Sequence, residues 1–131
     1  MADTLTQELL RLNQDLLDCI ARADWQPYLE LCDPTLTCFE PEALGQLVDG
    51  MEFHHFYFKL GGATPPFNTT MASPKVRIMG EVAVISYVRL NQRLSKDGVP
   101  GTRSVEETRV WQKQNGVWKH VHFHRSLPAN L

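Results

Sequence analysis

The period of the hydrophobic pattern changes once along the chain, and this change restricts the possible folds more than any other feature. Over residues 5–20 the apolar side chains recur at steps of three or four, which predicts a long amphipathic helix. From Asn68 onward the pattern becomes that of β-strands separated by Gly, Pro and Asp. Helices followed by consecutive antiparallel strands indicate an α+β chain, with the long helix on one face of a curved sheet.

Shorter elements are predicted between these two parts. Residues 25–32 form a second helix, because Pro27 is tolerated only in its first turn and Asp33-Pro34 ends it. Residues 36–39 are a candidate strand, the segment from Glu40 onward opens a helical stretch interrupted by glycines, and residues 51–60 form a third helix. The strands predicted in the second half are residues 68–72, 75–79, 82–94, 103–114 and 117–126.

Length and composition predict one globular domain over residues 1–131. With 43% hydrophobic and 21% charged residues, the chain differs in composition from disordered and membrane proteins. Thirteen Lys and Arg are scattered among fifteen Asp and Glu, so no basic stripe could follow a nucleic-acid backbone. No apolar run approaches the roughly 18 residues that span a bilayer. Neither a nucleic acid nor a membrane is an expected partner.

The cysteines suggest the compartment in which the chain works. Cys19, Cys32 and Cys38 are odd in number and contain no CxxC pair, a pattern typical neither of a disulfide framework nor of a zinc site. The first residues lack the basic and apolar regions of a secretory signal. A reducing, cytoplasmic location is therefore expected, and no cofactor is expected.

The last two predicted strands are joined by Asn115-Gly116, a strong hairpin signal that permits two registers. A two-residue loop places Trp111 opposite His120, whereas a three-residue loop over residues 114–116 places Trp111 opposite Lys119. We favour the three-residue loop, because it separates an apolar face from a row of histidines. The apolar face then holds Val105, Trp111, Val117, Val121 and Phe123, and the other face holds His120, His122 and His124.

The favoured register also places Arg109 and Arg125 on the apolar face, where permanently charged groups need partners. Glu107 lies on the same face two residues from Arg109, so a structural ion pair is one explanation. An anion pocket is the other, since Arg89 could join the two arginines from the neighbouring strand. Three arginines with one glutamate would leave positive charge suited to a carboxylate. Both explanations remain open at this point.

Four segments carry a resemblance to a known family. They are FEPEALGQLVDG (39–50), FHHFYF (53–58), EETRVW (106–111) and VHFHRS (121–126). Their sequence, order and spacing resemble the association, or hub, domain of calcium/calmodulin-dependent protein kinase II. Weaker similarity through the N-terminal helix and ISYVRLNQ extends the resemblance over nearly the whole chain.

The resemblance implies a cone-like fold of the nuclear transport factor 2-like superfamily, with a long N-terminal helix packed in a strongly curved antiparallel sheet. It also implies a homo-oligomer, a two-layer ring of about 12–14 subunits or more that organises the kinase subunits of a parent enzyme regulated by calmodulin. The chain contains no Gly-rich loop, HRD or DFG segment, so no kinase activity and no catalytic residue are expected in it.

The family's polar pocket maps onto this chain position by position. Its residues are His54 of FHHFYF, Arg89 of the strand after ISY, Arg109 of EETRVW and Arg125 of VHFHRS. The strand pattern selects the same arginines, with Glu107 beside them. The resemblance implies that this pocket binds small carboxylates or acidic peptide segments, and it implies no metal ligand.

The chain departs from the family pattern in three places. His55 stands where the family has Arg, the loop KLGGATPPFN is shorter and lacks a Trp, and Gly101 replaces the Arg of an IPRT segment while Arg103 follows two residues later. The shorter loop would affect ligand responses that depend on it. The change at Gly101 would affect the contacts between subunits of a ring.

Two other functions fit parts of the sequence. His120, His122 and His124 on one face of a strand could bind a metal ion, although no carboxylate motif accompanies them. An isomerase or dehydratase on the same fold could use His54 with Tyr57 or Tyr87 as acid or base. A pocket dominated by arginines favours holding an anion over abstracting a proton.

Overall fold

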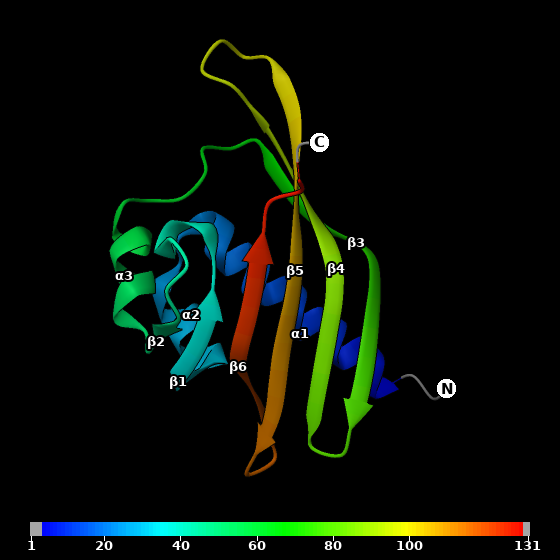
Figure 1. The fold of residues 1–131 in the computed structure, drawn as a ribbon. Helices are drawn as coiled ribbons and strands as arrows, with labels where there is room; N and C mark the ends of the chain where they lie inside the picture. The colour runs from blue at the N-terminus through cyan, green and yellow to red at the C-terminus, as the bar shows by residue number, and fades with distance from the viewer. Residues whose placement is uncertain (1–3, 130–131) are drawn as a thin grey trace.

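The structure is a computed structural model that describes residues 4–129, in which a long helix crosses the concave face of a curved six-stranded sheet (Figure 1). The sheet order is β2-β1-β6-β5-β4-β3, and all neighbours are antiparallel except the parallel pair β1 and β6. The elements before the long strands are α1 (Thr4–Arg22), α2 (Trp25–Leu31), β1 (Cys32–Phe39), the 3-10 turn η1 (Pro41–Ala43), β2 (Val48–Asp49) and α3 (Glu52–Lys59). The long strands are β3 (Phe67–Met79), β4 (Val82–Leu94), β5 (Pro100–Gln114) and β6 (Val117–Ser126).

The α+β class and the helix on the sheet are confirmed, and the differences concern shorter elements, strand bounds and one hairpin register. β3 is one strand where the sequence predicted two, because an irregularity between Ala72 and Lys75 takes up Ser73 at φ 51° without ending the ladder. β1 begins at Cys32 directly after α2. The segment after Glu40 forms one 3-10 turn and a two-residue strand instead of a helical stretch.

The register that we favoured for the β5–β6 hairpin is wrong. Gln114 pairs with Val117, so the loop has two residues, and both Asn115 (φ 51°) and Gly116 (φ 83°) have the positive φ of a type I′ turn. Trp111 lies opposite His120, and the register then shifts by one residue, so that Arg109 lies opposite Phe123. This bulge lets a tight turn coexist with arginines on the concave face.

The same bulge divides the predicted row of histidines. His120 lies on the concave face and is fully buried, whereas His122 and His124 alternate with the buried Phe123 and lie on the convex face. Val117, which we placed on the apolar face, is 54% exposed. The three histidines that the sequence placed on one face therefore lie on two faces of the strand, and they do not form the cluster on which the alternative metal-binding function depended.

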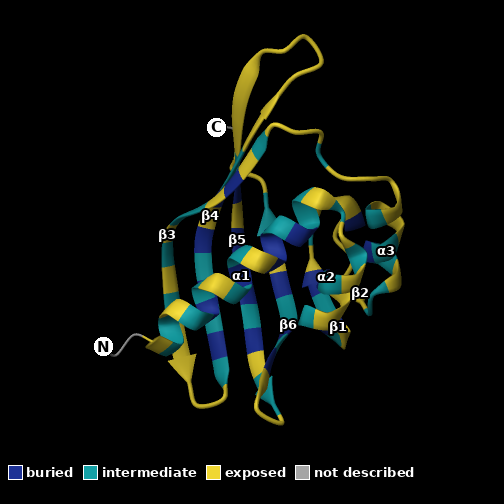
Figure 2. Ribbon diagram, turned by 180° about the vertical axis from the view of Figure 1, so that it is seen from behind, coloured by how far each residue is buried: buried dark blue, intermediate teal, exposed yellow. Residues whose placement is uncertain are grey.

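Helix α1 is joined to the sheet by apolar packing and by polar contacts, of which the most deeply buried involves Asn13. Leu9, Leu16 and Leu17 are fully buried in the core. Figure 2 shows the helix in front of the sheet, with buried and exposed stretches alternating along it. Between these leucines lies Asn13, also fully buried, whose Oδ1 accepts a hydrogen bond of 3.0 Å from Nε1 of Trp111. This contact ties the middle of α1 to the C-terminal part of β5.

We expect Asn13→Leu to lower the free energy of unfolding by about 1–3 kcal/mol, because Nε1 of Trp111 would be left buried without an acceptor. Urea unfolding followed by tryptophan fluorescence measures this change. The control is Gln7→Leu, which replaces an exposed amide on the same helix and should change stability little. A stability equal to wild type for Asn13→Leu would show that the bond does not anchor the helix.

Candidate ligand-binding site

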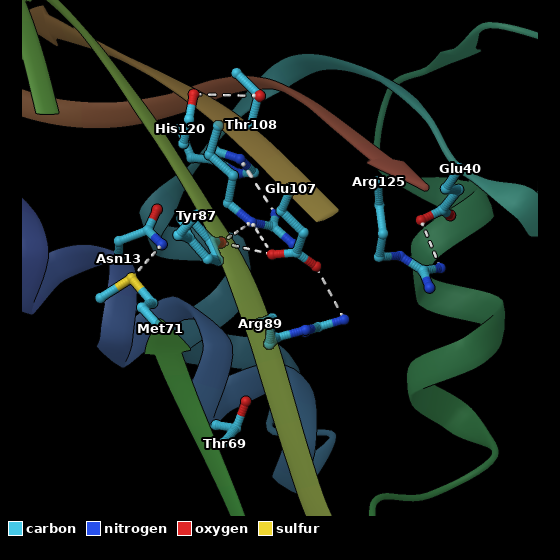
Figure 3. Close-up of polar contacts among 12 residues, drawn as sticks. Asn13, Glu40, Thr69, Met71, Tyr87, Arg89, Glu107, Thr108, His120 and Arg125 are labelled. Carbon is cyan, nitrogen blue, oxygen red and sulfur yellow. Dashed lines mark hydrogen bonds and ion pairs between the residues drawn. The ribbon is translucent and has the colours of Figure 1, made fainter. Parts of the chain in front are cut away.

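A polar cavity of about 240 Å³ opens beside the end of α1, between α3 and the concave face of the sheet. Its walls include His54 of α3, Arg89 of β4, Arg109 of β5 and Arg125 of β6, so the four pocket positions predicted from the sequence surround one space. Figure 3 shows Arg89 and Arg125 with their carboxylate partners Glu107 and Glu40. Glu107 does not line this cavity, and contacts Arg89 and Arg109 behind its wall.

Glu107 forms a buried ionic centre with the two deeper arginines. Its Oε1 lies 3.2 Å from Nε of Arg109 and its Oε2 lies 3.0 Å from Nη2 of Arg89, and Glu107 is only 3% exposed. Burial alone would raise the pKa of Glu107, but the guanidiniums of Arg109 and Arg89 hold it below its usual range. The structural ion pair considered from the sequence is therefore present and includes both arginines.

Tyr87 and Phe123 complete the surroundings of Arg109. The Tyr87 hydroxyl donates a hydrogen bond of 2.5 Å to Oε1 of Glu107, and Nε of Arg109 donates to the Tyr87 oxygen over 3.0 Å. The guanidinium carbon of Arg109 lies 4.3 Å from the centre of the Phe123 ring, within cation–π range. Burial raises the pKa of Tyr87 to about 12, and its proton is committed to Glu107. These contacts do not favour Tyr87 as the acid or base of an isomerase.

The contact between Arg89 and Glu107 is an ion pair without hydrogen-bond geometry. Although the atoms are 3.0 Å apart, Oε2 of Glu107 has no hydrogen bond of good geometry, and Nε of Arg89 is buried without any partner among the described residues. Burial lowers the pKa of Arg89 more than the charge of Glu107 raises it. Arg89 is thus less completely satisfied than Arg109.

Arg125 sits nearer the surface and is held by two other carboxylates. Its Nη2 donates to Oε1 of Glu42 and lies 3.4 Å from Oε2 of Glu40 (Figure 3). The Glu40 side chain is 8% exposed, and burial raises its pKa, whereas the Glu42 side chain is 39% exposed. Burial would raise the pKa of Glu42 too, but the bond from Arg125 keeps it lowered.

Glu40 and Glu42 change the charge that was expected here. Sequence reasoning assigned one carboxylate to the three arginines, and the structure places three carboxylates next to them. The predicted excess of positive charge is therefore wrong for this cavity. Both glutamates were missed because they come from the segment around η1, which the parallel pairing of β1 with β6 brings beside Arg125. The FEPEALG motif was the available signal.

His54 is a neutral group in the cavity wall. Burial, with the positive charges of Arg109 and Arg125, lowers its pKa to about 4. Its Nδ1 lies 3.9 Å from Oε1 of Glu40 and its Nε2 lies 3.8 Å from Sγ of Cys38. Potential metal ligands of these three residues lie within 4.8 Å of one another. Burial raises the pKa of Cys38 to about 12, however, so a cation would have to displace the thiol proton and compete with Arg125 for Glu40.

Comparisons with known proteins agree with the resemblance. The family model described as calcium/calmodulin dependent protein kinase II association domain matches residues 5–129. The type II subunit delta of this kinase from Oryctolagus cuniculus is 46% identical over 123 residues, 92% of this chain and 23% of that protein. The type II alpha chain from Drosophila melanogaster is 47% identical over 128 residues, 95% of this chain and 24% of that protein. The chain thus spans about a quarter of the length of these relatives.

Solved structures show the same fold. The association domain of C. elegans CaMKII has a TM-score of 0.90 and 46% identity, covering 95% of this chain and 96% of that one. The CamKII hub homology domain of Chlamydamonas reinhardtii has a TM-score of 0.88 and 49% identity, covering 96% of this chain and 100% of that one. A nuclear transport factor 2-like protein from Salmonella enterica has a TM-score of 0.76 at 25% identity, covering 99% and 95%. The predicted nuclear transport factor 2-like fold is confirmed. Within residues 4–129, no helix is both long and apolar enough to cross a bilayer.

The buried, neutral His54 should make stability depend on pH. In the unfolded chain a histidine has a pKa of about 6.5, and in the fold the pKa of His54 is about 4. Between these values the unfolded chain binds a proton that the fold excludes. The free energy of unfolding should therefore fall as pH is lowered from 6.5 to 4, by about 3 kcal/mol from this residue. Urea unfolding at several pH values should show a shallower slope for His54→Gln, and an unchanged slope would contradict the assignment.

Proposed function

The chain belongs to the calcium/calmodulin dependent protein kinase II association domain family, and from that premise we propose that it is an oligomerisation hub whose copies close into a two-layer ring. It corresponds to the association domain of these kinases and not to their catalytic domain. We further propose that it folds as one domain, catalyses no reaction itself and works in the cytoplasm, where its three buried, free cysteines would stay reduced.

The exposed apolar side chains support self-association. Leu44 is 87% exposed and Leu47 is 53% exposed in the segment after η1, while Phe56 is 55% and Leu60 is 69% exposed on or next to α3. Large apolar side chains that are this exposed are candidates for surfaces that a partner covers. A closed two-layer ring needs one head-to-tail contact around each layer and one symmetric contact between layers. These two segments are candidates for such contacts.

We expect native mass spectrometry of the purified chain to give a closed assembly of at least about ten copies of the 15.0 kDa subunit. The mass should be the same over a wide range of micromolar concentrations, because a closed ring leaves no free end at which to grow. A single 15.0 kDa species at these concentrations would refute the hub function.

We propose in addition that the cavity binds the carboxylate of a small molecule or of an acidic peptide segment, for instance one from the kinase part of a parent enzyme. The observation that carries this proposal is the pairing of Arg125 with Glu42 at the cavity mouth. Arg89 and Arg109 are held by the deeply buried Glu107, whereas Glu42 is partly exposed and approaches from a short 3-10 turn. An incoming carboxylate would replace Glu42 on Arg125 and leave the buried pairs intact.

This exchange predicts opposite effects for two substitutions. Glu42→Gln should raise the affinity for butyrate about tenfold, because it removes the competing carboxylate, and Arg125→Ala should lower it at least as much. Isothermal titration calorimetry measures both. Glu106→Gln is the matched control, since it removes an exposed carboxylate on the convex face and should bind butyrate as wild type does. Equal affinities for Glu42→Gln and wild type would rule out the exchange.

A further inference from the structure

A second cavity, of about 250 Å³, lies next to the first. It is bounded by the C-terminal end of α1 and by the loop at residues 61–63. Its other side is formed by Arg89, Asn91 and Arg93 in the C-terminal half of β4. Ile20 and Arg89 line both cavities, so the side chain of Arg89 stands between them. A ligand that extends past Arg89 would occupy both spaces.

The wall opposite β4 is fixed by a close approach of backbone to backbone. A Cβ atom on Gly62 would lie 2.5 Å from the carbonyl carbon of Arg22, so a residue with a side chain would force the loop away from α1. The next residue holds the loop in place, because the N–H of Ala63 donates a hydrogen bond of 2.8 Å to the carbonyl of Ala21. The second cavity therefore has a defined wall.

The side chains on the β4 side offer hydrogen-bond donors. The hydroxyl of Thr69 donates to Oδ1 of Asn91 over 3.0 Å, which leaves the amide N–H groups of Asn91 as its free polar atoms. Arg93 is exposed and forms no ion pair within residues 4–129. The partly satisfied Arg89, with its unpartnered Nε, is the third donor. Among the residues that the structure describes, no carboxylate lines this cavity.

The charge of the second cavity therefore differs from that of the first. At the first cavity, two carboxylates in the walls and Glu107 behind them balance three guanidiniums, whereas Arg93 adds a charge that no lining residue among those the structure describes compensates in the second cavity. The C-terminal end of α1 carries roughly half a negative charge, which disfavours an anion in this cavity. One of the terminal carbonyls, that of Ala21, is already bonded to the N–H of Ala63. A full guanidinium charge outweighs that partial charge.

We propose that Arg93 and Asn91 form a second anion subsite and that the preferred ligand is a linear dicarboxylate. This inference rests on the proposed carboxylate site at Arg125. One carboxylate replaces Glu42 on Arg125, the chain passes Arg89, and the other carboxylate meets Arg93 and the amide of Asn91. Each cavity alone has a smaller volume than a typical ligand pocket, but the two together have the volume of one typical pocket. This arrangement suits a narrow molecule that is charged at both ends.

The test compares diacids with monoacids of equal chain length by isothermal titration calorimetry. The pairs are succinate with butyrate, glutarate with pentanoate, and adipate with hexanoate. We expect the diacid that spans both subsites to bind about tenfold more tightly than its monoacid. Arg93→Ala should abolish this advantage and leave the affinity for the monoacid unchanged, while Arg93→Lys should restore part of it because it restores the charge.

Arg77→Ala is the matched control, because it removes an exposed arginine at the far end of β3 and should keep the full advantage of the diacid. If monoacids bind but no diacid binds more tightly, or if Arg93→Ala keeps the advantage, the second subsite is refuted and the site at Arg125 stands. If Arg93→Ala lowers monoacid affinity as much as diacid affinity, a separate subsite is also refuted. If neither class of acid binds, the proposed carboxylate site fails, and the dicarboxylate inference fails with it.

Discussion

The concave face of the sheet depends on the burial of one carboxylate. Glu107 is 3% exposed and contacts guanidiniums from two strands, Arg89 of β4 and Arg109 of β5. Without it, two permanent charges would be enclosed with little water to solvate them, a cost of several kcal/mol. Because Glu107 holds these two arginines, Arg125 is left to the carboxylates of Glu40 and Glu42. The division into a buried inner centre around Glu107 and an outer cluster around Arg125 follows from this one residue.

The regular elements were predictable because they follow one period over many residues. The long helix, β4 and β6 were found close to their true bounds from spacing alone. The bulge at Val121 of β6 was not, since one extra residue in a strand leaves no periodic trace, and it places His122 and His124 on the opposite face from the buried His120. Asn13 was also missed, because a polar residue inside an apolar stripe gives no sign of the indole that it will meet.

The arginines of the candidate site could be found from the sequence, but its net charge could not. Alternation along β4 and β5, and the resemblance to a known family, both selected Arg89 and Arg109. The balancing glutamates lie in a segment without strong periodicity, and they reach Arg125 through the pairing of Phe39 with His124. The net charge of a cavity depends on such distant pairings. Counting charged residues along single strands therefore predicted an excess of positive charge, which Glu40 and Glu42 balance in the folded chain.

The parallel pairing of β1 with β6 also determines how late in synthesis the chain can finish folding. Thr37 and His122, joined by a hydrogen bond of 2.8 Å, are separated by 85 positions in the chain. Contacts between such distant residues form slowly, because a long loop must close before they stabilise anything. On the ribosome, β1 has no neighbour on this side until nearly all of the chain has emerged. Assembly into any larger particle must therefore follow synthesis of β6, and a chain truncated before β6 would leave the buried residues of β1 without the strand that pairs with them.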